Sequence, residues 1–194
     1  MSRNHIEVFY EYVSMVFEKY GKEVPSLDTL RKEFTIPYMN FWNKYFPDMT
    51  IKEQNQMYEE FMSKKEIIAY PKVKEVLERL KIKGIKLFIL SSDTLITIYP
   101  EIKRAGISCL ISDVKDNCHE KTEALKELIK KHDLKTEETV YIGDTSGDVE
   151  EAKKAGLKTI AITWGLQSRE KILSSKPDFV INKIEEIEDI LEKI

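Results

Sequence analysis

The chain has 194 residues and a formal net charge of -3, from 31 lysines and arginines against 34 aspartates and glutamates. This length suits one α/β domain with a small insertion, and charges without long blocks of one sign argue against nucleic-acid binding. No apolar run has the length of a membrane span, and the N-terminus lacks a signal-peptide pattern. The two cysteines lack the spacing of a metal or redox pair. We therefore expect a cytoplasmic protein with no membrane partner.

The first 70 residues predict helices and no strand. Apolar side chains recur at helical spacing over residues 3–20, and further helices are expected over 26–34, 38–46 and 50–62. The same stretch holds fourteen of the nineteen aromatic residues of the chain. We interpret residues 1–70 as an all-helical cap, whose aromatic side chains either face a substrate or form a small core of their own.

From Pro71 onward, predicted strands alternate with predicted helices. Strands are expected over 85–90, 109–111, 139–142, 157–162 and 179–181, and helices over 71–83, 93–104, 120–132, 148–155 and 183–192. Such alternation is typical of a parallel sheet with right-handed crossovers. The predicted fold is therefore a Rossmann-like α/β domain over residues 71–194, preceded by the helical cap.

Two carboxylates bracket the turn after the predicted strand 139–142. Asp144 lies where the strand stops, and Asp148 opens a helical pattern that Gly156 closes. Open α/β sheets bind ligands at the carboxyl ends of their strands, and paired carboxylates suit a hard cation such as Mg²⁺. The structural alternative is a turn aspartate followed by a helix-capping aspartate.

Two further strand ends carry groups that suit the same chemistry. Ser91 supplies a hydroxyl after the strand 85–90, and Lys121 lies in the first turn of the helix from residue 120. A lysine there opposes the helix dipole, which disfavours a purely structural role, although a surface lysine remains the alternative. A hydroxyl, an ammonium and two carboxylates are the groups that a phosphoryl group needs around it.

These loops, in this order, resemble the motifs of the haloacid dehalogenase superfamily, in its phosphoglycolate-phosphatase-like branch. The segment Phe88-Ile-Leu-Ser-Ser-Asp93 is similar to the second motif, Lys121 within His119-Glu-Lys-Thr122 to the third, and Gly143-Asp-Thr-Ser-Gly-Asp148 to the fourth. A Gly-Asp pair in the fourth motif is typical of the Mg²⁺-dependent phosphatases of that family, whereas its dehalogenases usually carry asparagine there.

The resemblance implies a role for each of these side chains. Ser91, Ser92 and Lys121 would bind phosphate. Lys121, which would also hold the nucleophile, and Ser91 would be the catalytic residues present. Asp144 and Asp148 would bind Mg²⁺. The implied activity is hydrolysis of a phosphate monoester, with a small phosphorylated metabolite as substrate beneath the cap. A homodimer is left open.

One expected element is not found among the 194 residues. The family's first motif, Asp-x-Asp-Gly-Thr, supplies the aspartyl nucleophile and the general acid/base, and the resemblance places it a few residues before Ser2. The sequence as given is therefore expected to be a poor enzyme. Three interpretations stay open: a phosphatase whose 194-residue form lacks its nucleophile, a non-catalytic module that binds a phosphorylated metabolite or partner, and a half-enzyme completed in trans.

The strand that carries the first motif would lie between the strands expected at 85–90 and 139–142. Five buried apolar residues are worth roughly 1.5–3 kcal/mol each, and their ladder hydrogen bonds about 1 kcal/mol apiece more. An open slot with two unpaired edges would forfeit free energy on the order of a whole domain's stability, about 5–15 kcal/mol. Either the two neighbouring strands close the slot and pair directly, or another segment, from this chain or a partner chain, fills it. We expect closure, because no spare strand-like run is found before residue 85.

Overall fold

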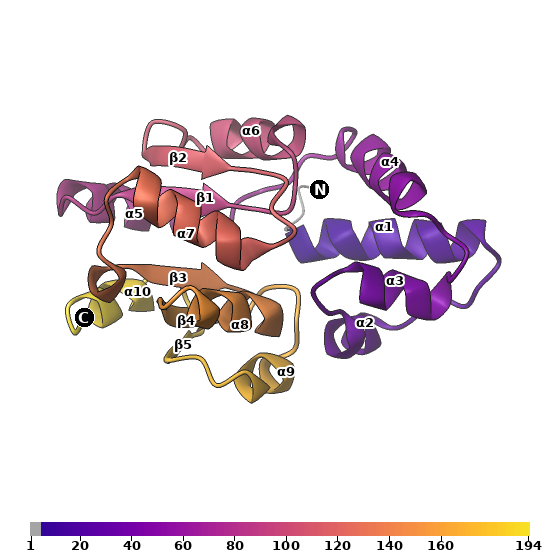
Figure 1. The fold of residues 1–194 in the computed structure, drawn as a ribbon. Helices are drawn as coiled ribbons and strands as arrows, with labels where there is room; N and C mark the ends of the chain where they lie inside the picture. Colours follow the sequence, from indigo (N-terminus) through magenta and orange to yellow (C-terminus); the bar gives the residue numbers. More distant parts are fainter. Residues whose placement is uncertain (1–4) are drawn as a thin grey trace.

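The computed structural model describes residues 5–194, which form a helical part and an α/β part that meet along one side (Figure 1). Ser2 and Arg3, which resemble the start of the family's cap, lie outside the described residues. The helical part consists of α1 (His5–Lys19), α2 (Leu27–Glu33), α3 (Met39–Tyr45) and α4 (Ile51–Met62). Among the described residues, no helix is both long enough and apolar enough to cross a membrane.

Local sequence signals set the ends of the cap helices. The Ser26 hydroxyl accepts the backbone N–H of Thr29 and so caps α2. Thr50 and Glu53 form a reciprocal capping box at the start of α4, in which each side chain accepts the other's backbone N–H. Gly21, at φ 64°, follows α1 in the left-handed region that glycine adopts at little cost. The four helices are therefore short elements with defined ends rather than one long bundle.

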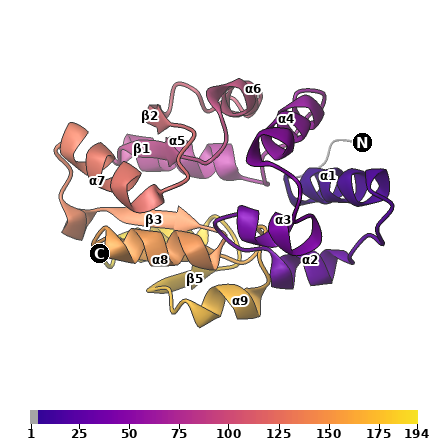
Figure 2. The same ribbon diagram turned by 45° about the vertical axis from the view of Figure 1, so that its right-hand side comes forward.

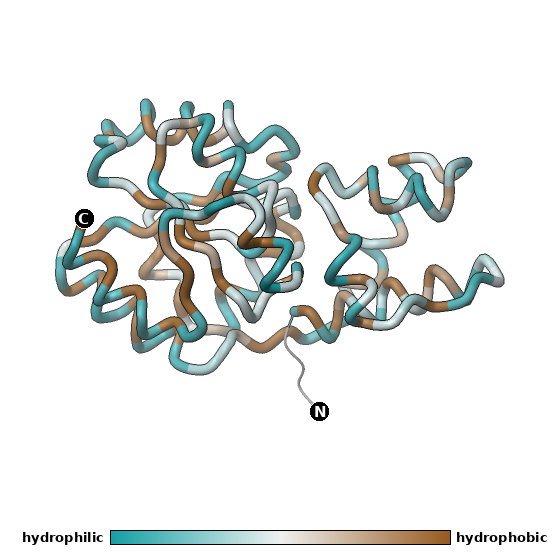
Figure 3. The backbone as a smooth tube through the Cα atoms, turned by 90° about the horizontal axis from the view of Figure 1, so that it is seen from below, coloured by the Kyte–Doolittle hydropathy of each residue, from teal (hydrophilic) through white to brown (hydrophobic). Residues whose placement is uncertain are grey.

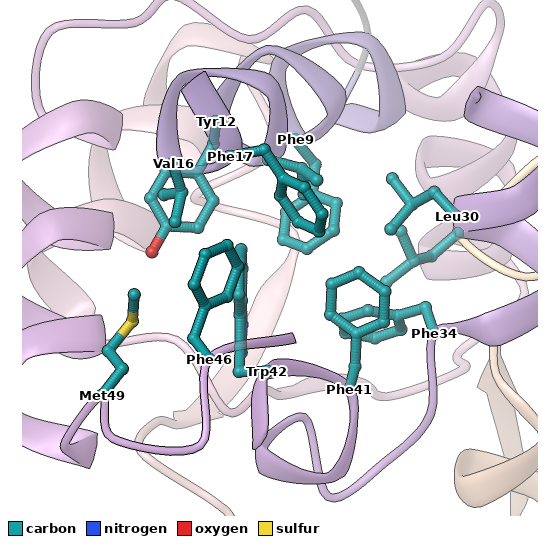
Figure 4. Close-up of a cluster of buried hydrophobic side chains, with 12 residues drawn as sticks. Phe9, Tyr12, Val16, Phe17, Leu30, Phe34, Phe41, Trp42, Phe46 and Met49 are labelled. Atoms are coloured by element: carbon teal, nitrogen blue, oxygen red, sulfur yellow. The ribbon is translucent and has the colours of Figure 1, made fainter. Parts of the chain in front are cut away.

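Besides a small cluster of Val8, Met62 and Ile67, one large apolar cluster holds these helices together (Figure 4). Aromatic rings dominate it, and many of them meet edge to face, as Phe17 and Phe46 do with ring centroids 4.9 Å apart. The buried members of this cluster are Phe9, Tyr12, Val13, Val16, Phe17, Leu30, Phe34, Phe41, Trp42, Phe46, Met49 and Leu166. Leu166 comes from the α/β part, so the cap core extends across the boundary between the two parts.

The α/β part alternates helices with parallel strands, which confirms the predicted fold class. Its helices are α5 (Val73–Ile82), α6 (Leu95–Arg104), α7 (Lys121–Lys131), α8 (Ser146–Lys154), α9 (Arg169–Ser174) and α10 (Glu186–Leu191). Its strands are β1 (Leu87–Leu90), β2 (Ile111–Lys115), β3 (Val140–Gly143), β4 (Lys158–Ile162) and β5 (Phe179–Ile181).

Several predicted boundaries were wrong. The second strand begins at Ile111 rather than ending there, because residues 108–110 form a turn after Ile107. The helix after β1 begins at Leu95 with Thr94 at its N-cap, two residues beyond the predicted start. Asp148 does not open α8 but is its third residue, because Thr145 takes the N-cap position. Helix α9 was not predicted, since it is only six residues long.

The strands form two separate sheets instead of one. β1 pairs with β2, and β4 lies between β3 and β5, all in parallel register, while β1 and β3 belong to different sheets (Figure 2). The prediction that β1 and β3 would close and pair directly is therefore wrong. No strand lies between them among residues 5–194 either.

The space between β1 and β3 is a groove of about 810 Å³. Apolar side chains line it on two faces: Leu80, Ile187 and Leu191 from α5 and α10, and Leu125, Leu128 and Ile129 from α7. Figure 3 shows that the hydrophobic residues of the α/β part gather in its interior. A fully buried parallel strand has apolar side chains on both faces, and this groove offers apolar walls on both.

Helix α7 contacts both sheets beside the groove. Its first residue, Lys121, is ion-paired with Asp148 of α8, while Lys131 and His132 at its other end both bond Asp113 of β2. The helix is thus fixed to the β3–β5 sheet through α8 at one end and to the β1–β2 sheet at the other. Direct pairing of β1 with β3 would have to shift these contacts.

Candidate functional site

A cavity of about 270 Å³ lies between the cap and the carboxyl ends of β1 and β3. All five side chains singled out from the sequence line it: Ser91, Ser92, Lys121, Asp144 and Asp148. They come from three different loops, which the parallel sheets bring to one edge. The site predicted from separate motifs is therefore assembled in space.

Asp148 has hydrogen-bond partners for both carboxylate oxygens. Its Oδ1 receives Lys121 Nζ at 2.6 Å and the Tyr141 hydroxyl at 3.3 Å. Its Oδ2 receives the Thr145 hydroxyl at 2.7 Å and the Thr145 backbone N–H at 3.1 Å. Asp148 is 3% exposed, so these bonds are made away from solvent. The capping role that was the structural alternative for Asp148 is thus present, together with a buried ion pair.

The pKa values of Lys121 and Tyr141 reflect this buried pair. Burial acts to lower the pKa of Lys121, but the Asp148 carboxylate, with smaller contributions from Tyr141 and Asp144, outweighs it and raises the pKa above its ordinary value. Burial, and then the negative charge of Asp148, also raises the pKa of Tyr141. Lys121 therefore stays a cation in the cavity wall and Tyr141 stays a neutral hydroxyl.

Asp144 has more freedom than Asp148. Its Oδ2 accepts the backbone N–H of Leu166 at 2.8 Å. Burial, followed by the nearby charge of Asp148, raises the pKa of Asp144. Gly165 passes so close that a Cβ added there would lie 2.2 Å from the Asp144 Cβ, so only glycine fits beside this carboxylate. Asp144 is held from one side and faces the cavity with the other.

The loop after β1 is tied down by backbone hydrogen bonds. The Ser91 hydroxyl accepts the Asp93 N–H at 3.1 Å, and the Ser91 carbonyl accepts the Cys118 N–H at 2.8 Å. The Asp93 carbonyl accepts the Asn117 N–H at 2.8 Å. The loop after β1 is therefore hydrogen-bonded to the loop after β2. These bonds place the Ser91 hydroxyl at the cavity before any ligand arrives.

Sequence reasoning missed the cap side chains that complete the cavity. The Tyr58 hydroxyl donates to Asp93 Oδ2 at 3.3 Å, and the Tyr38 ring lies 5.7 Å from the His119 ring, so both join the cap to the α/β part. Trp42 and Asn55 also line the cavity. The aromatic richness of residues 1–70 was the available signal, but it did not separate these residues from those of the cap core.

The two predicted metal ligands, Asp144 and Asp148, differ in what they offer a divalent cation. Mg²⁺ is usually bound by one or two carboxylates and keeps several waters. Asp144 offers one carboxylate at the cavity, whereas both oxygens of Asp148 are already bonded. No group of three or more histidine, cysteine, aspartate or glutamate residues within residues 5–194 is arranged to hold a metal ion. These residues fit a weakly held hard cation with Asp144 as its protein ligand.

The comparison with protein families agrees with the motifs. Residues 3–162 match the family model described as haloacid dehalogenase-like hydrolase. The chain belongs to the haloacid dehalogenase-like hydrolase family. This confirms the resemblance drawn from the second, third and fourth motifs, and homologous phosphatases support the phosphoglycolate-phosphatase-like branch.

Curated relatives of the chain include phosphatases. The chain is 31% identical over 114 residues to a phosphoglycolate phosphatase of Synechococcus elongatus, a match that covers 58% of this chain and 54% of the relative. It is 30% identical over 130 residues to the pyrophosphatase PpaX of Bacillus mycoides, which covers 64% and 60%. The chain thus matches little more than half the length of these relatives.

Solved structures share the fold of this haloacid dehalogenase-like hydrolase. A haloacid dehalogenase-like family hydrolase from Streptococcus pneumoniae superimposes with a TM-score of 0.81 at 22% identity, over 95% of this chain and 90% of that chain. A hydrolase from Pseudomonas syringae gives a TM-score of 0.75 at 15% identity, over 97% and 92%. At such identities the likeness concerns the fold alone.

Proposed function

We propose that this chain carries the phosphate-binding and cation-binding half of a Mg²⁺-dependent phosphatase that hydrolyses the phosphate monoester of a small metabolite. The observation that carries the proposal is the convergence of Ser91, Lys121 and Asp144 on one cavity of about 270 Å³ between cap and sheet. A phosphoryl group needs a donor, a cation and a metal ligand around it, and these three side chains supply them.

Each side chain has a role that follows from its chemistry. The Ser91 hydroxyl would donate to a phosphate oxygen, and its loop is already fixed by the contacts to Asp93 and Cys118. Lys121, kept protonated by Asp148, would neutralise phosphate charge without being able to take a proton. Asp144 would hold Mg²⁺, which neutralises the phosphoryl oxygens when bound.

The nucleophile would have to come from outside these 194 residues. The family resemblance assigns it to an aspartate at the end of a strand between β1 and β3, and the groove of about 810 Å³ lies between those strands. A strand there, parallel to its neighbours, would end at the cavity edge where Ser91 and Asp144 lie. Without that carboxylate, formation of a phospho-aspartate is closed to the chain.

The cavity also bears on the kind of substrate. Its cap wall combines rings such as Tyr38 and Trp42 with the amide of Asn55, so it suits a small organic group with polar substituents. A volume of about 270 Å³ lies just below the range typical of drug-sized ligand sites, roughly 300–1,000 Å³. A small phosphorylated metabolite fits this space better than a phosphoprotein segment.

The test is hydrolysis of p-nitrophenyl phosphate in the presence of Mg²⁺. We expect negligible turnover by residues 1–194 alone. Fusing a strand of five apolar residues followed by Asp-x-Asp-Gly-Thr ahead of Met1 should raise the rate by orders of magnitude, because nucleophile and acid/base are both restored. The matched control carries Asn-x-Asn-Gly-Thr on the same strand and should stay inactive. Robust turnover by the unextended chain that is lost in Asp144→Ala would show that another nucleophile exists.

A second candidate function is phosphate binding without catalysis. It is favoured by one observation: the buried Lys121–Asp148 pair and the fixed Ser91 loop are in place although the groove is open. Calorimetric titration of the unextended chain with inorganic phosphate separates the two candidates. Binding that is lost in Ser91→Ala, together with an inactive fused-strand protein, would favour the binding module.

A further inference from the structure

The loop of residues 163–168 after β4, called the bridging loop below, lies between the cap and the loop of Asp144. The Leu166 side chain belongs to the aromatic cluster of the cap, while its backbone N–H donates to the Asp144 carboxylate at 2.8 Å. From the cap, the Arg31 guanidinium donates to the carbonyls of Thr163 at 3.1 Å and Gln167 at 3.0 Å. One short loop therefore touches both walls of the cavity.

Gln167 is the residue of this loop that bonds in both directions. Its backbone N–H donates to the Asp144 carbonyl at 3.3 Å, and its side-chain Oε1 accepts the Ser146 N–H at 2.6 Å. Its Nε2 donates to the carbonyl of Phe34 in the cap at 2.7 Å. The side chain is 0% exposed, so none of these bonds is exchanged with solvent.

An amide is the side chain that this position demands. Ser146 is the first residue of α8, and its N–H is a donor that the helix itself cannot satisfy. Phe34 offers a carbonyl, which can only accept. A carboxylate of the same shape would serve Ser146 but would set a second acceptor against the Phe34 carbonyl, and the bond from position 167 to the cap would be lost. The side-chain amide of Gln167 thus connects the Ser146 N–H in the α/β part to the Phe34 carbonyl in the cap.

We propose that Gln167 is a positioning residue that couples the placement of the cap over the cavity to the geometry of Asp144 and of the amino end of α8. The inference rests on the proposed function for what the cavity does, whereas the coupling is defined by the contacts alone. Because such coupling is reciprocal, a ligand that orders the loop of Asp144 would favour the cap placement seen here, and this placement would favour that ligand.

The decisive experiment is a double-mutant cycle in the metal-free chain, read by hydrogen exchange of the cap amides in residues 27–38. Ser146→Pro removes the N–H that Gln167 accepts and places the ring Cδ where the Gln167 Oε1 lies, so the amide must also turn away, while proline itself is well tolerated at the first position of a helix. Thr145, at φ -129° and ψ 155°, already has the extended backbone that a residue before proline prefers. Gln167→Glu keeps the acceptor for Ser146 but loses the donation to Phe34.

We expect Ser146→Pro to speed cap exchange by about fivefold or more, the lower end of typical coupling between sites. In the Gln167→Glu background, Ser146→Pro should have less than about a twofold further effect, because the link is already cut. Lys171→Met is the matched control. Lys171 bonds the same Phe34 carbonyl at 2.7 Å but no atom of the Asp144 loop, so its variant should loosen the cap yet leave the effect of Ser146→Pro intact.

Equal effects of Ser146→Pro in both backgrounds, or no effect on the cap at all, would overturn the inference. Should Gln167→Glu fail to fold, Gln167→Met takes its place in the cycle, since it removes both side-chain bonds at nearly constant volume. A separate calorimetric titration with Mg²⁺ should show weaker binding in Gln167→Glu than in the wild-type chain. Absence of Mg²⁺ binding to the wild-type chain would count against the proposed function alone, because the exchange cycle needs no metal.

Discussion

The cap and the α/β part differ in how completely they bury their apolar side chains. In the cap, short helices share one aromatic cluster, and residues such as Leu30 and Val16 are fully buried. In the α/β part, the buried residues fall into several smaller clusters, and two of these have half-buried residues of both β1 and β3 packed against them: Leu87 with Val140, and Leu90 with Tyr141. The residues of β1 are all half-buried, although strands of a parallel sheet are normally covered on both faces.

The difference shows what each architecture requires. Helices satisfy their own backbone hydrogen bonds, so a helical cap can form a complete core from its own residues. A parallel sheet needs every central strand, because each strand supplies both backbone partners and a layer of side chains. Helix α7 bonds residues of both parts of the sheet region, and α5 bonds α10 through Arg79 and Glu188, but neither pair of contacts fills the space between β1 and β3.

Filling the groove should produce the largest change. The fused strand with Asn-x-Asn-Gly-Thr lacks catalytic carboxylates, so it isolates the structural effect. Burial of about five apolar residues and new ladder bonds on both edges should raise the free energy of unfolding of the α/β part by on the order of 5 kcal/mol or more. Urea denaturation followed by circular dichroism measures this gain. A fused strand with alternating lysines is the control, and equal stabilisation by both strands would contradict insertion into the groove.

Breaking the contact between α7 and α8 should be the next largest effect. Asp148→Asn leaves Lys121 as a buried cation without its charged partner, which typically costs about 3–5 kcal/mol. Because α7 also reaches β2, we expect the β1–β2 sheet to lose protection from hydrogen exchange along with β3–β5. The exposed pair of Lys126 and Glu123 on the same helix is the matched control, and Glu123→Gln should change stability by less than about 1 kcal/mol.

Truncating a leucine should distinguish the two cores directly. Leu30→Ala in the cap should cost about 2–5 kcal/mol, as for fully buried leucines. Leu90→Ala in β1 should cost less than half of that, because Leu90 is half-buried and already borders the groove. Thermal unfolding of both variants measures the two costs. Similar losses would mean that the groove is closed in solution, and the Leu90→Ala cost should rise once the fused strand is present.

How far the sequence predicted this structure differs between the same two regions. Periodic apolar residues and caps such as Thr50 located the cap helices within a few residues, since these signals are local. The loops of Ser91, Lys121 and Asp144 were predicted because each follows a strand end in a recognisable motif. The open groove was not predicted, because the estimate of the free energy lost by leaving the slot open did not consider the contacts that α7 makes with both sheets.

Other features depended on contacts between distant residues. The double role of Asp148 as cap and ion-pair partner needs Lys121, which lies 27 residues away. Gln167 joins the cap to the acidic loop across 133 residues, and no local pattern marks it. Such residues become visible only when the fold brings their partners together.

The smallest predicted effect concerns the other end of α7. Hydrogen bonds from Lys131, and next from His132, lower the pKa of Asp113 to about 2. A carboxyl whose pKa is lowered on folding stabilises the protein above its unfolded pKa of about 3.9, and this contribution is lost as the pH falls from about 4 to 2. Lys131 is largely exposed, so solvent screening reduces the contribution to about 1 kcal/mol.

Asp113→Asn should therefore lower the unfolding free energy by about 1 kcal/mol at pH 7, and the difference from wild type should vanish near pH 2. Urea titrations at several pH values measure it. The control is Asp116→Asn, just beyond the end of β2, which removes a carboxylate that accepts the Leu95 N–H and not the Lys131 and His132 donors. A difference that stays constant with pH would mean that Asp113 does not hold α7 by charge. In that case the β1–β2 sheet would be held to α7 by its other contacts, such as the Lys115–Glu127 ion pair and the Phe88 ring, which lies 4.8 Å from the ring of His132.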